Sequence, residues 1–302
     1  MTFFRRAFYF LLVNFLVVIT ISIILNFFNI PRYLSHKGIN YSALLIFCFI
    51  WGMGGAFISL LLSKKIAKGM LKIKIIKNPL TATEEEILSA VNFYSQKLGL
   101  DAPEIGIYDS NEVNAFATGA SKNNALIALS SGIVNRMNLN EIKAVIGHEI
   151  SHIANGDMVT MTLIQGIVNA FVMFISRVAA FFLLGNNRKS NSNFQYYLLI
   201  HLFEMLFFVL GSVPVAYFSR FREFRADSGS ASLNNKDDMI AALKTLQSMQ
   251  EMKKEPFKKV AFSSLKISSS KKNFFKLFAT HPPIEKRIER LKNYYTSSQS
   301  LK

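Results

Sequence analysis

Four long apolar stretches constrain this chain more than any other feature of its sequence. They cover residues 7–28, 41–62, 158–184 and 194–218. Each is close to or above the ~20 residues that a helix needs to cross a bilayer. At 51% hydrophobic residues, the chain is also too apolar for an ordinary soluble protein of 302 residues. We therefore expect an integral membrane protein, mainly α with a small β-sheet, with four transmembrane helices.

Polar residues interrupt the third and fourth stretches, namely Gln165, Arg177, His201 and Glu204. A buried helical hairpin of a globular domain is therefore the alternative to two membrane spans. Charged side chains are costly in lipid unless they are paired or reach toward an interface. Because Arg177 and Glu204 can lie at similar depth across a short hairpin, we expect them to form an ion pair.

The first apolar stretch is expected to stay in the protein as an anchor. Arg5 and Arg6 precede it, as in a signal peptide, but the run is too long and no small-residue cleavage site follows before Pro31. Lysine and arginine near the spans indicate orientation. Six lysines follow the second stretch and three arginines follow the fourth (Lys64, Lys65, Lys68, Lys72, Lys74, Lys77; Arg220, Arg222, Arg225). Because basic segments next to membrane spans tend to face the cytoplasm, both termini should lie on that side.

The formal net charge of +16 is explained without nucleic acid, for which no fold motif is present. Much of the basic excess lies beside the apolar stretches, where anionic lipid attracts it. The single cysteine, Cys48, excludes an intramolecular disulfide and a cysteine-rich metal site. The charge pattern therefore predicts contact with anionic lipid.

Residues 148–152 read His-Glu-Ile-Ser-His, the HExxH arrangement. Two histidines four apart share a helix face, so His148 and His152 can bind one metal ion while Glu149 reaches a water molecule as general base. Asn138 and Glu141 give the helix a capping-box start. The alternative is an exposed helix with two solvated histidines, but apolar residues at helical spacing favour a half-buried helix (Ile142, Val145, Ile146, Ile153).

A catalytic zinc site needs a third protein ligand and one open position. Glu223 and His281 are the candidates on the predicted cytoplasmic side, and we favour Glu223. Asp227 lies four residues after Glu223 on the same helix face, where it can accept a hydrogen bond from a ligand imidazole. The alternative is that both carboxylates only pair with the arginines around them.

The apolar stretches divide the chain into four parts. Residues 1–64 contain the first two spans, 65–157 the first part of a catalytic domain, 158–218 the second pair of spans, and 219–302 the rest of that domain. We expect strands at 104–108, 114–118 and 125–129, with a turn at 119–124. We expect a helix from Thr83, capped with Glu86 and ended by Gly99, and helices at 219–233, at 236–252 and from near Pro283. Residues 263–272, rich in serine and lysine, should form a mobile loop.

Four motifs resemble the HtpX family of bacterial membrane-bound zinc metalloproteases, which are related to the CAAX prenyl proteases. They are residues 114–119 (Asn-Ala-Phe-Ala-Thr-Gly), residues 148–152 with 155–157 (Asn-Gly-Asp), residues 222–227 (Arg-Glu-Phe-Arg-Ala-Asp) and residues 280–288, which begin Thr-His-Pro-Pro. The likeness runs along nearly the whole chain, in the order of the family's motifs.

The resemblance implies one Zn²⁺ per chain, held by His148, His152 and Glu223, with Glu149 catalytic and a gluzincin-like fold. It implies the inner membrane as the location and damaged or misassembled membrane proteins as substrates under stress, with other membrane quality-control proteases as partners. It makes His281 and Arg287 candidates for helping the oxyanion or bracing the site. The alternative for His281 is that the sequence His-Pro-Pro only starts a helix.

Residues 114–119 would form an edge strand that binds extended substrate through main-chain hydrogen bonds (Asn114, Ala115, Phe116, Ala117, Thr118, Gly119). The alternative is an internal hairpin strand. Two other functions are alternatives: a membrane transporter or channel using the polar residues of the spans, and an inactive metal-binding scaffold. The transporter leaves the HExxH sequence unexplained, and the loss of activity in a Glu149→Gln variant would exclude the scaffold.

Overall fold

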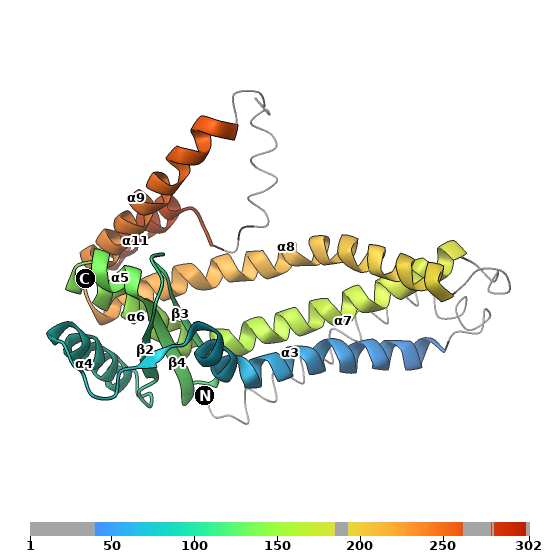
Figure 1. The fold of residues 1–302 in the computed structure, drawn as a ribbon, viewed down its shortest axis with the longest axis horizontal. Coiled ribbons are helices and arrows are strands. Elements are labelled where there is room, and N and C mark those ends of the chain that lie inside the picture. The colour runs from blue at the N-terminus through green and yellow to red at the C-terminus, as the bar shows by residue number, and fades with distance from the viewer. Residues whose placement is uncertain (1–39, 185–192, 262–278, 280, 300–302) are drawn as a thin grey trace. The chain divides into compact units, whose positions relative to one another are not determined.

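The computed structural model describes residues 40–184, 193–261, 279 and 281–299, and it is mainly helical with one small sheet (Figure 1). Contacts divide the chain into two compact units. One comprises Met1–Ser59 and Thr162–Val215, and the other comprises Leu60–Met161 and Ala216–Lys302. The predicted first span at 7–28 and the predicted loop at 263–272 lie outside the described residues.

Three described helices are long and apolar enough to cross a membrane: α3 (Tyr41–Leu71), α7 (Asp157–Leu184) and α8 (Asn193–Leu233). They contain the second, third and fourth apolar stretches. Large apolar side chains such as Ile50, Trp51 and Leu206 are exposed among the described residues, as contact with lipid requires. The predicted continuation of the fourth stretch as a helix at 219–233 is confirmed, because these residues belong to α8.

Small residues allow the helices of the first unit to approach closely. A Cβ atom at Gly52 would lie 2.5 Å from the backbone nitrogen of Ala170, and one at Gly166 would lie 2.6 Å from Sδ of Met53. Glycine at such positions is typical of helix packing in membranes. Beside these contacts, the buried Cys48 packs with aromatic residues of α7 in an apolar cluster.

The predicted ion pair between the third and fourth stretches is confirmed. Arg177 donates from Nη1 to Glu204 Oε1 at 2.9 Å, and His201 Nδ1 lies 3.2 Å from Oε2 of the same carboxylate. The guanidinium also lies 5.8 Å from the ring centroid of Phe47. A charged pair inside an apolar unit is tolerated because each group neutralises the other.

We expect Arg177→Glu or Glu204→Arg alone to lower the stability of the detergent-solubilised protein by about 2–3 kcal/mol, since each leaves two like charges in an apolar unit. The double charge swap should recover much of this loss. Thermal unfolding midpoints would measure both effects. A double variant no more stable than either single variant would contradict the pairing.

The second unit contains a four-stranded mixed sheet in the order β1-β2-β4-β3. The strands are β1 (Lys74–Ile75), β2 (Glu104–Tyr108), β3 (Ala115–Ser121) and β4 (Asn124–Ser130). The three strands predicted from the sequence are confirmed, and β1 is added. The predicted turn at 119–124 was wrong in extent, because β3 continues to Ser121 and β4 begins at Asn124. Because β3 pairs only with β4 in the described sheet, it is an edge strand, as expected.

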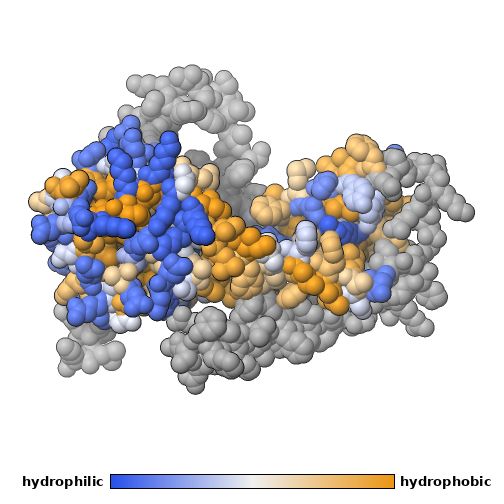
Figure 2. Space-filling model, turned by 60° about the horizontal axis from the view of Figure 1, so that its bottom comes forward, coloured by the Kyte–Doolittle hydropathy of each residue, from blue (hydrophilic) through white to orange (hydrophobic). Residues whose placement is uncertain are grey.

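Among the described residues, five helices lie wholly within this unit: α4 (Ala82–Lys97), α5 (Ser131–Arg136), α6 (Leu139–Asn155), α9 (Lys236–Ala261) and α11 (Ile284–Gln299). α6 lies in the middle and packs against α4, α9 and β3. Its apolar residues Ile142, Ile146, Ile150 and Ile153 are fully buried in the core of this unit. Many hydrophilic residues cover the visible face of the molecule around this core, shown in blue in Figure 2.

Capping residues set the ends of α4 and α6. The predicted capping box of Asn138 and Glu141 is confirmed, and α6 ends at Gly156 in the left-handed conformation, with φ 73°. The predicted cap of α4 was wrong by two residues. Thr81 rather than Thr83 accepts the first hydrogen bond, from the backbone of Glu84, because the earlier threonine offers the same spacing and adds half a turn of helix.

Candidate metal centre

Two imidazoles from one turn of α6 face each other at the centre of the second unit. Nε2 of His148 and Nε2 of His152 are 3.2 Å apart, and their rings lie edge to face. Both side chains are buried. The local cause is the spacing of four residues, which places both rings on the same face of a helix whose other face forms the core.

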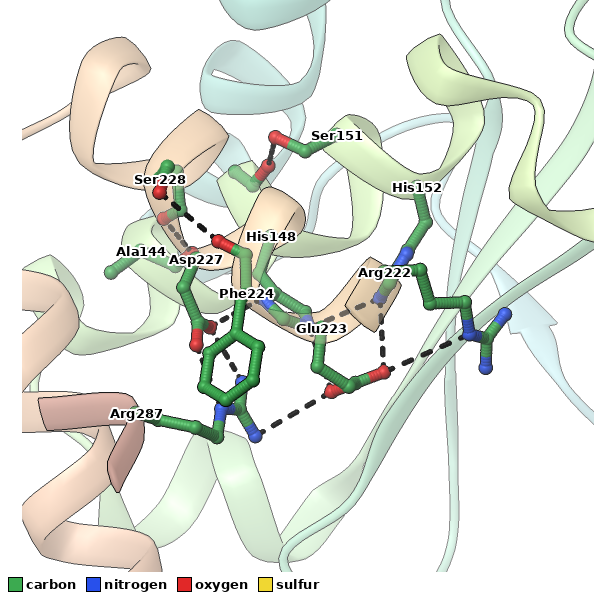
Figure 3. A network of polar contacts seen from close by, with 12 residues as sticks. Ala144, His148, Ser151, His152, Arg222, Glu223, Phe224, Asp227, Ser228 and Arg287 are labelled. Carbon is green, nitrogen blue, oxygen red and sulfur yellow. Dashed lines mark hydrogen bonds and ion pairs between the residues drawn. The ribbon is translucent and has the colours of Figure 1, made fainter. Parts of the chain in front are cut away.

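The third group is the carboxylate of Glu223, which comes from α8 (Figure 3). Its Oε1 lies 3.5 Å from Nε2 of His152 and its Oε2 lies 3.6 Å from Nε2 of His148. Together the three residues offer atoms within 4.8 Å of one another, close enough to bind one metal ion. The structure therefore brings together the three residues that the sequence suggested as ligands.

Asp227 and Arg287 brace this group from the side of His148. Asp227 Oδ1 lies 3.0 Å from Nδ1 of His148, although the ring N–H does not point at the oxygen well enough for a regular hydrogen bond. Arg287, on α11, donates two hydrogen bonds to Asp227 at 2.8 and 2.6 Å. Its Nη1 also lies 3.5 Å from Glu223 Oε2. A bidentate guanidinium fixes the carboxylate in place and balances its charge.

Asp157, which was not predicted as a site residue, makes a similar contact with His152. Nδ1 of His152 lies 2.7 Å from Oδ2 of Asp157, and both residues are buried. A signal was present in the sequence, because an acidic residue directly follows Gly156, which ends the helix. The distance from Asp157 to the imidazole of His152 depends on the turn at Gly156, which the sequence alone does not specify.

The donor set fits a divalent cation. Since both Nδ1 atoms face carboxylates, each neutral imidazole places its proton on Nδ1 and its lone pair on Nε2. Two such lone pairs and a carboxylate then meet in one buried place, where they repel one another unless a positive charge lies between them. Two histidines and a glutamate form one of the ligand sets of catalytic zinc.

The same electronegative surroundings attract a proton in the metal-free protein. Burial by itself would lower the pKa of His148, but the carboxylates of Asp227 and Glu223 outweigh burial and raise the pKa to about 9. The pKa of His152 is also raised, because Asp157 and Glu223 outweigh its burial. Metal binding at neutral pH must therefore displace protons from this site.

A cavity of about 650 Å³ opens beside the three groups. Glu149 lines it next to His148. His281 lines it as well, and its Nδ1 lies 3.0 Å from Oε2 of Glu223, while 65% of its side chain is exposed. Asn114, Arg220 and Arg287 also contribute polar groups to the wall.

The predicted substrate strand only partly reaches the cavity. Asn114 and Ala115 line it, whereas Phe116 packs beside Tyr108 in a separate apolar cluster. The remaining residues, Ala117, Thr118 and Gly119, continue the ladder with β4 away from the lining. The alternation of side chains along a strand explains why neighbouring residues have different surroundings.

Known proteins are similar to this chain in sequence or in fold. The model of Peptidase family M48 matches residues 81–295. Protease HtpX of Thioalkalivibrio sulfidiphilus is 42% identical, and the alignment covers 95% of this chain and 98% of that protein. Protease HtpX of Mannheimia succiniciproducens is 45% identical with the same coverage. The crystal structure of S. mikatae Ste24p is similar in fold, with a TM-score of 0.61 at 18% identity, and the match covers 93% of this chain and 66% of that one.

The chain therefore belongs to Peptidase family M48. Together with three helices long and apolar enough to span a bilayer, this makes it a membrane metalloprotease. The HtpX resemblance predicted from the motifs is confirmed, and neither the transporter nor the scaffold hypothesis is favoured. A metal cofactor follows from the family and from the group of two histidines and a glutamate.

We expect Arg287→Lys to lower the stability of the protein by about 1–3 kcal/mol, because lysine cannot make both hydrogen bonds to the buried Asp227. The matched control is Arg290→Lys on the same helix, an exposed arginine whose guanidinium lies 4.6 Å from the ring centroid of Phe224. Thermal unfolding in detergent would measure the difference. Equal midpoints for the two variants would show that the bidentate contact contributes little.

Proposed function

We propose that the chain is a zinc-dependent endopeptidase in which His148, His152 and Glu223 hold the metal and Glu149 is the catalytic base. We place it in the bacterial inner membrane with its active site and both termini in the cytoplasm. Its substrates are damaged or misfolded membrane proteins, and other membrane quality-control proteases are its proposed partners. The observation that supports the site best is the convergence of two imidazoles and one carboxylate within 4.8 Å.

A bound zinc ion supplies Lewis-acid activation of water and of the scissile carbonyl. Glu149 accepts the proton of the attacking water and passes it to the leaving amine. His281 lies beside Glu223 with most of its side chain exposed, so it is suited to donate a hydrogen bond to the developing oxyanion. Arg287 holds Asp227 and Glu223 in place rather than meeting the substrate.

The edge strand β3 gives the substrate a backbone to pair with. Asn114 and Ala115 stand where this strand enters the cavity, and the outer edge of β3 has no strand partner among the described residues. An extended peptide added there would have its backbone beside Glu149 and the ligand histidines. Main-chain pairing depends little on side-chain identity, which suits a protease that removes many different damaged proteins.

Apolar residues from four helices form the other walls of the cavity: Ile133, Val145, Met239, Leu246 and Ile284. Such a wall favours a large apolar side chain next to the scissile bond. Segments of this composition are buried in folded membrane proteins and become accessible when those proteins misfold. The cavity therefore supports the proposed substrate class.

Lipid contact is proposed for only part of the basic segment after the second apolar stretch. Lys64 and Lys68 both pair with Glu104 on β2 and so connect the end of α3 to the sheet. The proposed attraction to anionic lipid rests on Lys65, Lys72, Lys74 and Lys77 of the same segment.

Glu149→Gln should keep the fold and the zinc. It should lower the rate of peptide hydrolysis by ~10²–10⁴-fold, because glutamine cannot accept the proton of the attacking water. Zinc content by elemental analysis and casein cleavage would be measured on the same preparation. Glu289→Gln, an exposed change on α11, is the control. Near-normal proteolysis by a zinc-loaded Glu149→Gln protein would exclude the assigned role.

Glu223→Ala should lose most of its zinc affinity, since two imidazoles alone leave the metal with too few protein ligands. Chelator competition would measure the dissociation constant beside that of Glu289→Ala. Unchanged zinc content in the folded Glu223→Ala protein would remove this residue from the ligand set.

Peptides with leucine or phenylalanine next to the scissile bond should be cleaved ~10–200-fold faster than peptides with aspartate there, as expected for an apolar pocket. A peptide library with product identification by mass spectrometry would measure this preference, and Glu149→Gln would control for contaminating proteases. Equal rates for apolar and acidic residues would argue against the apolar wall as a substrate pocket.

A further inference from the structure

We propose that Asp157 is a positioning residue that fixes the orientation and tautomer of His152. This inference rests on the metal site proposed above. Oδ2 of Asp157 lies 2.7 Å from Nδ1 of His152, and Asp157 is 4% exposed. Because a carboxylate can only accept, the ring proton lies on Nδ1 and the Nε2 lone pair is free for a metal.

The Nε2 lone pair of His152 points toward the other two proposed metal ligands. Nε2 of His152 lies 3.2 Å from Nε2 of His148 and 3.5 Å from Oε1 of Glu223. A ring rotated about its bond to Cβ, or protonated on Nε2, would present no lone pair at this point. Asp157 therefore selects the one ring state of His152 that can share a metal with the other two groups.

The turn between α6 and α7 brings the carboxylate to the imidazole. Gly156 adopts φ 73° and its N–H bonds to the carbonyl of Ile153, which ends α6. α7 then begins at Asp157, so its side chain folds back over the last turn of α6. A Cβ at Gly156 would meet nothing nearer than Lys122 Cε at 3.8 Å, so the glycine serves the backbone conformation rather than close packing.

Both ligand imidazoles thus have a carboxylate on the nitrogen that faces away from the metal. Asp227 takes this position for His148, and Asp157 takes it for His152. The two carboxylates come from different helices, α8 and the first turn of α7. The two contacts are separate, so loss of the hydrogen bond between Asp157 and His152 should weaken metal binding on its own.

An alternative role for Asp157 is only to stabilise the start of α7, since a negative charge is favourable near a helix N-terminus. The two roles differ in what they stabilise. A helix-start role affects folding of the metal-free protein, whereas a positioning role affects the affinity for the metal and the tautomer of His152. The experiment must measure these quantities separately.

The test compares zinc dissociation constants of the full-length protein in detergent, measured by chelator competition. Asp157→Asn removes the charge with little change of shape, and Asp157→Ser keeps a polar helix start but is too short to reach the ring. The control is Asp237→Asn, which removes an exposed carboxylate from the first turn of α9. We expect ~10–100-fold weaker zinc binding for both Asp157 variants and no change for the control.

Two further measurements separate positioning from folding. Thermal unfolding of the metal-free Asp157 variants should show one cooperative transition, as for the Asp237 control, so that a loss of zinc affinity is not a loss of the fold. In metal-free, histidine-labelled protein at a pH high enough for the ring to be neutral, ¹⁵N chemical shifts should show His152 protonated on Nδ1 in the unaltered chain and as a mixture of tautomers in Asp157→Asn.

Zinc affinity within twofold of the unaltered chain in either folded variant would overturn the inference. So would a failure of both metal-free variants to fold, because Asp157 would then support the fold rather than the ligand. If the unaltered chain itself bound no zinc, the proposed function would fail instead, and the two failures are therefore distinguishable.

Discussion

The metal centre depends on the close approach of α8 to α6. A Cβ atom at Gly147 would lie 3.1 Å from Oγ of Ser230, and one at Gly229 would overlap the side chain of Ser151. Ser230 also donates a hydrogen bond to the backbone carbonyl of Ala144 at 2.6 Å. Because only small residues stand at this crossing, a glutamate side chain from α8 is long enough to reach both imidazoles on α6. Larger residues there would move the helices apart and separate the three groups.

The second constraint is charge balance in a buried place. Four buried carboxylates (Glu149, Asp157, Glu223 and Asp227) and two imidazoles lie together, and the Arg287 guanidinium is the cation that contacts both Asp227 and Glu223. A buried network of this kind is stabilising only when its members are satisfied. Arg287 and a divalent metal together meet that condition, so the ligands, their bracing carboxylates and the arginine act as one unit.

The residues of the site come from both sides of the membrane hairpin in the sequence. His148 and His152 precede α7, whereas Glu223 and Asp227 follow the apolar part of α8. The second unit is therefore complete only when the chain has passed through the hairpin and returned. The hairpin contains its own ion pair between Arg177 and Glu204, which connects the two helices independently of the metal centre.

The sequence by itself determined what depends on local spacing. The HExxH turn, the capping box at Asn138, three strands and the apolar helices all follow from periodicity and capping chemistry within a few residues. The tertiary structure alone decided which of two equivalent threonines caps α4, and that only Asn114 and Ala115 of the predicted substrate strand reach the cavity. It also revealed Asp157 beside His152. These features depend on distances between groups that the chain brings together only by turning or by packing helices, and spacing along the sequence does not encode such distances.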